Sequence, residues 1–160
     1  MFDLKQRVLL YVSPTLLVFQ EEGQLKEGLG GWELRWENIQ AIAVGGDWVA
    51  AATDEEIRIM DYRGNELHSV AFDRRMVTME AYEDMLVVVY HSALPMWGCQ
   101  SLRMLVLRVG RNKVERERDV MVPLRARSQL KWFGFSEEGM LYCHDTLEAV
   151  RCYLYEEDRW

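Results

Sequence analysis

Short apolar runs and turn-forming clusters alternate along the segment 38–70. Four strands are predicted from the apolar runs, at residues 39–44, 48–53, 57–61 and 66–72. Three turn-forming clusters separate these strands: Gly45-Gly46-Asp47, Asp54-Glu55-Glu56 and Arg63-Gly64-Asn65. Strands this short, joined by tight turns, indicate one antiparallel four-stranded unit.

The same pattern recurs on both sides of this unit. Downstream, strands are predicted at residues 76–81, 85–91, 102–109, 113–121, 130–135, 140–144 and 150–155. Upstream, they are predicted at residues 8–12, 16–20 and 32–36. Four-stranded units that repeat about every 40 to 45 residues are the blades of a β-propeller. We therefore expect an all-β chain, a WD40-like β-propeller segment of about three to four four-stranded antiparallel blades.

We expect residues 1–160 to form one partial β-propeller that is made of these blades. The blades are expected at approximately residues 7–36, 39–72, 76–122 and 129–160. Because propellers have about four to eight blades, the chain is either a very small propeller or part of a larger one. A partial propeller leaves strand edges and apolar inter-blade surfaces uncovered, so we expect the isolated chain to associate.

Composition and charge narrow the class of protein. An apolar content of 49% excludes a disordered chain, and a net charge of −7 disfavours general binding to the nucleic-acid backbone. Cys99, Cys143 and Cys152 form no Cys-x-x-Cys pair, which predicts neither a disulfide framework nor a zinc site and fits a reducing compartment. No apolar run approaches the roughly 18 residues that span a bilayer, and the start lacks the order of a secretory signal. We expect an intracellular protein with no membrane contact.

No catalytic, metal-binding or cofactor-binding residue is predicted, so we do not expect an enzyme. His68, His91 and His144 are isolated from one another and from any metal-binding spacing. The acidic cluster 54–56 suits a solvated hairpin turn better than a cation site or acid–base chemistry. Cys99 has no nearby basic partner in the sequence that would activate it as a nucleophile. Phosphate-binding glycine motifs and a Gly-x-Ser-x-Gly elbow do not occur.

The predicted loop 92–101 is a candidate interaction surface. It holds Leu94, Met96 and Trp97 with little charge around them, which is unusual for an exposed connection. Two arrangements remain open. The loop either presents a contact surface or tucks over the face of the propeller.

Basic residues concentrate in a second candidate region. They are Arg103, Arg108, Arg111, Lys113, Arg116, Arg118, Arg125, Arg127 and Lys131. Interleaved with Trp132 and Phe133, they could hold a single nucleic-acid strand by charge and stacking. Alternation along a strand instead sends neighbouring charges to opposite faces, and the strand that carries Trp132 is expected to be buried. A solvated blade edge is the simpler interpretation. Arg116 and Arg118, on the predicted outer strand 113–121, complete the candidate interaction surface.

Three segments resemble one known family in their order and spacing. They read Asp-Trp-Val-Ala-Ala-Ala-Thr-Asp at 47–54, Leu-Val-Val-Val-Tyr-His at 86–91 and Leu-Lys-Trp-Phe-Gly-Phe-Ser-Glu-Glu-Gly at 130–139. The chain is similar here to the middle β-propeller of the WD-repeat and HMG-box DNA-binding protein family. The likeness covers residues 38–152. At 57–61, Ile-Arg-Ile-Met-Asp stands where a general WD repeat has its Trp-Asp.

The resemblance implies a nuclear replisome adaptor that links the replicative helicase, through GINS, to DNA polymerase α. It also implies homotrimer formation and a six-bladed propeller, of which this chain is roughly the first half. The family's helical peptide-binding domain, amino-terminal WD40 propeller and HMG box do not match these residues, so no peptide-binding or DNA-binding residue carries over. Chromatin or DNA contact in this segment is a weak expectation. Two alternatives stay open: a generic WD-like interaction module in another intracellular complex, and a nucleic-acid-binding module that uses the stretch 103–131.

Overall fold

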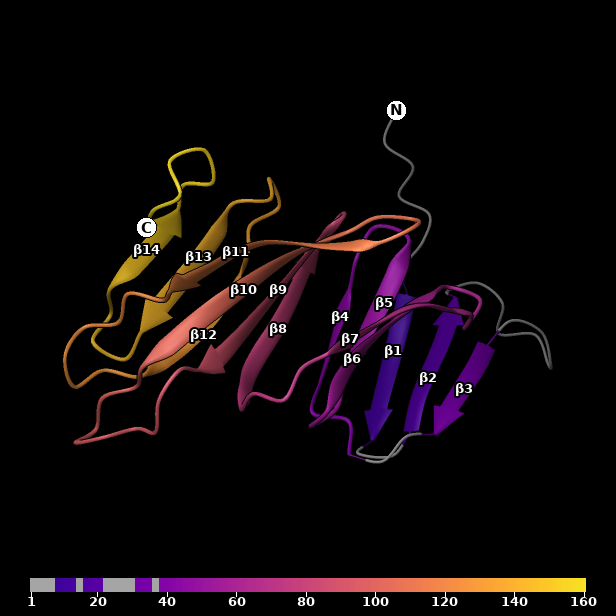
Figure 1. Ribbon diagram of the computed structural model, residues 1–160, viewed down its shortest axis with the longest axis horizontal. Helices are drawn as coiled ribbons and strands as arrows, with labels where there is room; N and C mark the ends of the chain where they lie inside the picture. The colour runs from indigo at the N-terminus through magenta and orange to yellow at the C-terminus, as the bar shows by residue number, and fades with distance from the viewer. Residues whose placement is uncertain (1–7, 14–15, 22–30, 36–37) are drawn as a thin grey trace.

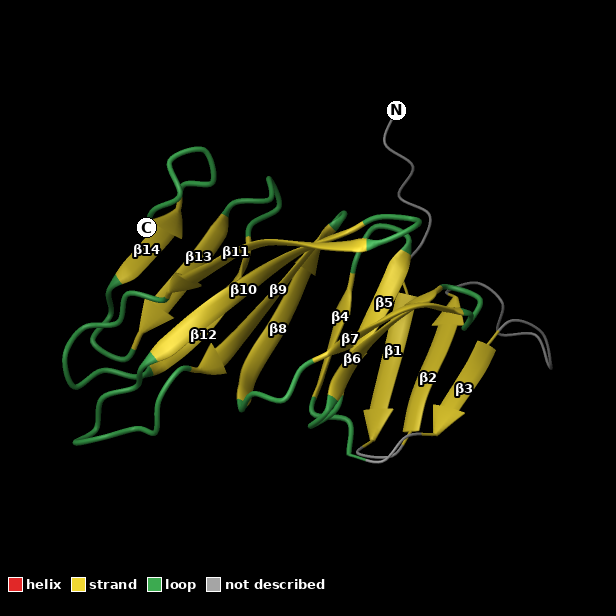
Figure 2. Cartoon of the chain, in the orientation of Figure 1, coloured by secondary structure: helices red, strands yellow, loops and turns green. Residues whose placement is uncertain are grey.

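The structure is a computed structural model that describes residues 8–13, 16–21, 31–35 and 38–160. Within these ranges the regular elements are β-strands, paired antiparallel, and no helix occurs among them (Figure 2). The first sheet joins β1 (Val8–Ser13), β2 (Leu16–Glu21) and β3 (Gly31–Arg35) in that order. The upstream strands are therefore confirmed, although residue 36 lies outside the described residues.

The second sheet is the four-stranded unit predicted in the segment 38–70. It consists of β4 (Ala41–Val44), β5 (Trp48–Ala52), β6 (Glu56–Asp61) and β7 (Glu66–Ala71), in sequence order. Its last turn is fixed locally, because the Asp61 carboxylate accepts hydrogen bonds from the backbone N–H groups of Arg63 and Asn65 at 2.8 and 2.9 Å. Gly64 supplies the φ of 84° that this turn needs.

Two further sheets follow along the chain. The third contains β8 (Met76–Tyr82), β9 (Met85–His91), β10 (Leu102–Val109) and β11 (Val114–Met121). The fourth contains β12 (Leu130–Phe135), β13 (Leu141–Asp145) and β14 (Val150–Tyr153). After β14 the chain turns back, and Arg159 forms an isolated bridge with Leu154. The predicted strands are confirmed to within two residues at each end.

The four sheets follow one another along the long axis of the molecule (Figure 1). The first strands of the second, third and fourth sheets touch in succession, since β4 contacts β8 and β8 contacts β12. The sheets β1–β3 and β12–β14 lie at opposite ends of this row (Figure 1). Consecutive antiparallel sheets that meet through their first strands are the blades of a propeller, and the architecture is that of a WD40-like β-propeller segment.

Among the residues whose burial the structure describes, the hydrophobic core forms two layers between sheets. Strand β9 serves both layers because its side chains alternate between the two faces. Leu86, Val88 and Tyr90 join the cluster shared with the second sheet, whereas Val87 and Val89 join the cluster shared with the fourth. A strand covered on both sides needs a continuous apolar run, and this accounts for the Leu-Val-Val-Val-Tyr sequence.

The Gly-Gly-Asp-Trp sequence at 45–48 has a packing explanation. The indole of Trp48 is 1% exposed and belongs to the first core cluster. A Cβ atom on Gly45 would lie 2.2 Å from the Trp48 ring, so only glycine fits. The same Cβ on Gly46 would meet nothing closer than 3.5 Å. The first glycine is therefore a requirement of the buried tryptophan.

The strand that carries Trp132 was expected to be buried, but it is only half buried. Phe133 points into the second core cluster, but Trp132 is 49% exposed. The pairing of β12 with β13 shifts register between Leu130 and Trp132. The Trp132 ring lies over Gly134, where a Cβ would come within 2.7 Å of it. The irregular pairing and the missing Cβ together let the indole lie on the outer side of the sheet.

Candidate interaction surface

The loop between β9 and β10, residues 92–101, extends beyond the ends of its strands (Figure 1). Its base is closed by the backbone N–H of Ser92, which donates to the Ser101 carbonyl at 2.9 Å, and by the two serine hydroxyls at 2.7 Å. Leu94 is 72% exposed, Met96 65% and Trp97 92%. Of the two arrangements open from the sequence, the structure has the exposed one, and the apolar side chains stand in solvent.

Trp97 occupies the apex of this loop in a constrained conformation. Met96 and Cys99 exchange backbone hydrogen bonds of 3.2 and 2.9 Å, leaving Trp97 and Gly98 as a two-residue turn. Their φ angles are 54° and 74°, the left-handed pattern of a type I′ hairpin turn. A left-handed backbone costs about 1–2 kcal/mol for a residue with a side chain. The turn therefore holds the indole at the tip at the expense of local strain.

Two connections between sheets brace the loop. On one side, the backbone N–H of His91 donates to the Arg75 carbonyl at 2.9 Å. On the other, the backbone N–H of Arg127 donates to Cys99 Sγ at 3.3 Å, and that of Leu130 donates to Gln100 Oε1 at 2.8 Å. The segments 72–75 and 122–129 thus lie on the same side of the molecule as the loop.

Asp145, the last residue of β13, is buried and contacts the bracing segment 122–129. Its carboxylate accepts hydrogen bonds from the Arg125 guanidinium at 3.1 and 3.2 Å and from the N–H groups of Leu147 and Ala149 at 3.0 Å. The Arg125 guanidinium holds the pKa of Asp145 well below its usual range, and the backbone donors add to this effect. The charge of Asp145 therefore ties the segment 122–129 to the turn between β13 and β14.

A second network lies beneath the loop, at the end of β9. The Tyr90 hydroxyl donates to the Asp119 carboxylate at 2.8 Å, and Arg103 Nε donates to the same carboxylate at 2.7 Å. Arg74 lies over the Tyr90 ring, 4.9 Å from its centroid. Burial opposes ionisation of Asp119, but hydrogen bonds from Arg103 and Tyr90 prevail and lower its pKa. Arg74 and Arg103 are committed to this internal network.

Arg116 and Arg118 do not lie beside the apolar loop. They pair with Leu107 and Val106 on either side of an irregularity in the β10–β11 ladder. The loop joins β10 at Leu102, and Arg116 pairs with Leu107, five residues further along the strand. Five residues of a strand span about 17 Å, which separates Arg116 from the loop. Arg118 forms an ion pair with Asp158 at 3.1 Å, whereas Arg116 is exposed. The five candidate residues thus form two separate sites.

Most cations of the stretch 103–131 are neutralised within the chain. Each pair is close enough for an ion pair: Arg103 with Asp119, Arg108 with Asp84 and Glu117, Lys113 with Glu115, Arg118 with Asp158, Arg125 with Asp145, and Lys131 with Glu148. The stretch is therefore a weaker attractor for phosphate groups than its sequence suggests.

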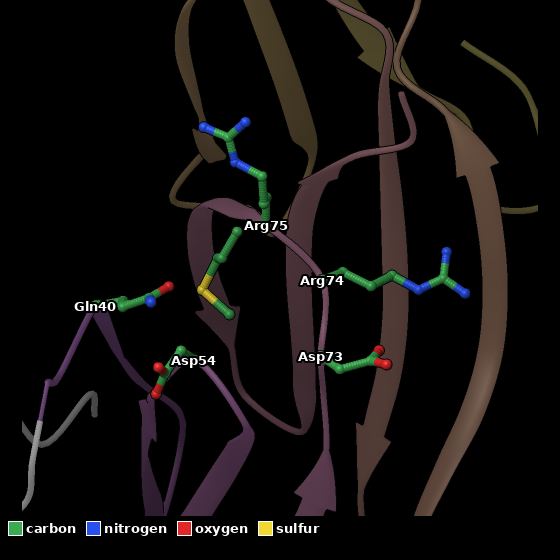
Figure 3. Close-up of a pocket in the computed structure, with 6 residues that line it drawn as sticks. Gln40, Asp54, Asp73, Arg74 and Arg75 are labelled. Atoms are coloured by element: carbon green, nitrogen blue, oxygen red, sulfur yellow. The ribbon is translucent and has the colours of Figure 1, made fainter. Parts of the chain in front are cut away.

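The surface also contains a crevice of about 220 Å³. Its lining residues are Gln40, Asp54, Asp73, Arg74, Arg75 and Met76. Figure 3 shows that these side chains do not converge: Gln40 and Asp54 lie together, Asp73 and Arg74 extend to the opposite side, and Arg75 points away from both groups. The arrangement offers no acid–base pair at a shared point.

Three further properties of the described residues bear on chemistry. They contain no cluster of three or more histidine, cysteine, aspartate or glutamate residues that could hold a metal ion. No helix long and apolar enough to cross a membrane occurs in these ranges. Burial raises the pKa of the Cys143 thiol to about 11, which keeps it protonated at neutral pH.

Sequence reasoning did not single out Arg75, and it named Arg127 only as one of the basic residues of the stretch 103–131; both contact the apolar loop through their backbones. Their importance depends on which neighbouring cations are paired, and that is a property of the folded chain. Asp145 was also missed as an anchor. Here a local signal exists, since an aspartate that begins a turn commonly accepts from the N–H groups that follow it.

The successive antiparallel sheets, which meet through their first strands, define a class of fold, the WD40-like β-propeller. The family model described as "Minichromosome loss protein, Mcl1, middle region" matches residues 5–160. The chain belongs to this family.

Curated proteins with similar sequences carry two names. WD repeat and HMG-box DNA-binding protein 1 is 36% identical in Xenopus laevis over 72% of this chain, and 33% identical in Homo sapiens over the same share. Protein ENHANCER OF LHP1 1 of Arabidopsis thaliana is 32% identical over 76% of the chain. The matched part is 10% of the first two proteins and 13% of the third. The chain thus spans about a tenth of the length of these relatives.

A solved structure shares the fold. The crystal structure of HIRA(644-1017) superposes with a TM-score of 0.59, covering 97% of this chain and 50% of the other. Sequence identity is 14%, so the likeness concerns the fold alone.

Proposed function

We propose that the chain is a non-enzymatic scaffold segment of a nuclear DNA-replication adaptor. In this role it supports protein–protein interaction and self-association, while the whole protein links the replicative helicase, through GINS, to DNA polymerase α. The observation that carries the proposal is the family match over residues 5–160. Two relatives have DNA binding in their names, which agrees with a role at chromatin.

Exposed apolar side chains on the fourth sheet support self-association. Trp132 on β12 is 49% exposed, and Val150 on β14 is 61% exposed. Exposed apolar side chains on one sheet favour contact with another protein surface. A homotrimer is the proposed arrangement.

Internal ion pairing favours the scaffold over a nucleic-acid-binding module. In the described part of the chain, Arg111, Arg116 and Arg127 are the cations of the stretch 103–131 for which no ion pair is formed. Tight phosphate binding usually draws on more free cations than this. Reversing the charge of Arg116 and Arg118 is expected to leave binding of single-stranded DNA unchanged.

Affinity purification tests the proposal directly. The endogenous protein that carries this segment is tagged and purified, and its partners are identified by mass spectrometry, with an unrelated tagged β-propeller protein as the control. Enrichment of GINS and DNA polymerase α subunits is the expected result. A purification that contains neither complex would refute the replication role.

Sedimentation velocity of the chain tests self-association separately. Species larger than a monomer are expected, in proportions that rise with concentration. A single monomeric species of 18.9 kDa at all concentrations would contradict it.

A further inference from the structure

The apolar loop 92–101 contacts the backbones of two arginines whose side chains pair with nothing in the described part of the chain. Arg75 precedes β8 and Arg127 precedes β12, and both are exposed. Their backbones brace the loop through His91 and Cys99. No ion pair or side-chain hydrogen bond involves either guanidinium among the described residues.

The neighbouring arginines in the same two segments, unlike Arg75 and Arg127, do have internal partners. Arg74 is held by the Tyr90 ring and hydroxyl, and Arg125 is held by Asp145. Figure 3 shows the Arg75 side chain pointing away from Asp54 and Asp73. Each connecting segment thus fixes one arginine internally and leaves the other exposed, with Arg75 bonded through its backbone at the base of the loop and Arg127 through its backbone near the tip.

The loop itself presents a preformed apolar anchor point. Its two-residue turn places Trp97 at the tip of the loop before any partner arrives, and the exposed side chains of Leu94 and Met96 add apolar area to the same loop. Tryptophan and arginine are the residues most enriched at the energetic centres of protein interfaces. A rigid aromatic side chain also loses little conformational entropy on binding.

We propose that Trp97, Leu94, Met96, Arg75 and Arg127 form a docking surface for an acidic peptide segment that carries an apolar anchor side chain. The carboxylates of such a segment complement the two free guanidinium groups, and its apolar side chain covers the indole. This inference rests on the proposed scaffold function and specifies the chemistry of one partner.

Nucleic acid suits the surface less well. Leu94 and Met96 offer no flat ring for a base to stack on, and Trp97 is the single aromatic residue of the loop. Two free arginines with a strip of apolar side chains between them do not make a continuous groove for a phosphate backbone. The chain also carries a net charge of −7, which repels a polyanion more strongly than a short peptide.

The test uses a fluorescein-labelled peptide in which aspartate and glutamate residues flank a central phenylalanine and leucine. Binding to the purified chain is followed by fluorescence anisotropy at low and at physiological salt. Trp97→Ala is expected to weaken binding about 30-fold, the usual loss at an interface hot spot. Arg75→Glu combined with Arg127→Glu is expected to weaken it at least about tenfold and to remove most of its salt dependence.

Matched controls separate this surface from general effects. Arg111→Glu reverses a charge in the turn at the other end of β10 and should bind the peptide as the unmodified chain does, within about twofold. An uncharged version of the peptide, with asparagine and glutamine, should bind at least about tenfold more weakly. Circular dichroism melting curves confirm that each variant is folded, and Trp97→Gly, which relieves the left-handed strain, provides a second variant without the indole.

Several results would overturn the inference. The first is that the peptide does not bind. The second is that the tryptophan and arginine variants bind it as well as the unmodified chain does. The third is that labelled oligothymidylate binds instead of the peptide and that its binding depends on the same residues. Loss of self-association in Trp97→Ala would assign the surface to a second copy of the chain instead. Co-purification with GINS and DNA polymerase α does not depend on these outcomes, so failure here leaves the proposed function standing.

Discussion

The contact between Gly45 and Trp48 leads to a sharp prediction about stability. Gly45→Ala places a methyl group 2.2 Å from an indole that is 1% exposed. The ring cannot move away without displacing the first core cluster, which it shares with Ile59 and Leu86. Overpacking of this kind costs about 1–3 kcal/mol. We expect the free energy of unfolding to fall by about 2 kcal/mol, which corresponds to a fall of roughly 4–8 °C in melting temperature for a domain of this size.

Gly46→Ala is the matched control in the adjacent position. Its methyl group would meet the Glu83 backbone at 3.5 Å, an ordinary contact, and neither glycine has a left-handed φ. The substitution is expected to be neutral or stabilising by about 0.4–1 kcal/mol, because alanine restricts the unfolded chain. Urea unfolding followed by far-UV circular dichroism measures both variants. Equal shifts in the two midpoints, or a stabilised Gly45→Ala, would refute the packing argument.

Further predictions concern the buried polar groups. Tyr90→Phe keeps the ring and removes the hydroxyl bonded to Asp119, so urea unfolding should show a loss of about 1.5–3 kcal/mol. The lowered pKa of Asp145 means that its contribution to stability is complete above its unfolded pKa near 3.8 and is lost as the pH falls below that value. Asp145→Asn should therefore destabilise the chain at pH 7 and flatten its acid unfolding curve between pH 4 and 2; an unchanged curve would contradict this. Cys143 should resist iodoacetamide in the folded chain and react once urea unfolds it, as peptide mass spectrometry can show.

The strands and their order could be predicted from the sequence because the signals are local. Turn clusters such as 63–65 and apolar runs such as 85–91 act within a few residues, and antiparallel hairpins join neighbours in the chain. The exposure of Trp132 could not be predicted, since it depends on a register shift between β12 and β13. Alternation along a strand assumes regular pairing, and an irregularity breaks that assumption.

The apolar content of the loop 92–101 could be read from the sequence, whereas its exposure was left open there, and its role as an interaction surface stays a prediction. Leu94, Met96 and Trp97 stood out because apolar residues in a loop are unusual, and the structure places them in solvent. Arg116 and Arg118 were grouped with them on charge alone, but position along β10 and β11 separates the two sets. Charge pairing depends on residues far apart in sequence, such as Arg125 and Asp145, and a list of basic residues cannot reveal it.

The sharing of β9 between two core layers has a consequence for how the chain unfolds. The third sheet takes part in a core cluster on each face, whereas the fourth sheet, at the end of the row, takes part in one of the two. No forty-residue unit owns a complete core, so the smallest cooperative element is a pair of neighbouring sheets, as in other stacked repeat proteins. Amide hydrogen exchange should consequently be slowest in β9 and β10 and become faster toward β14, tracing a gradient of local opening along the row.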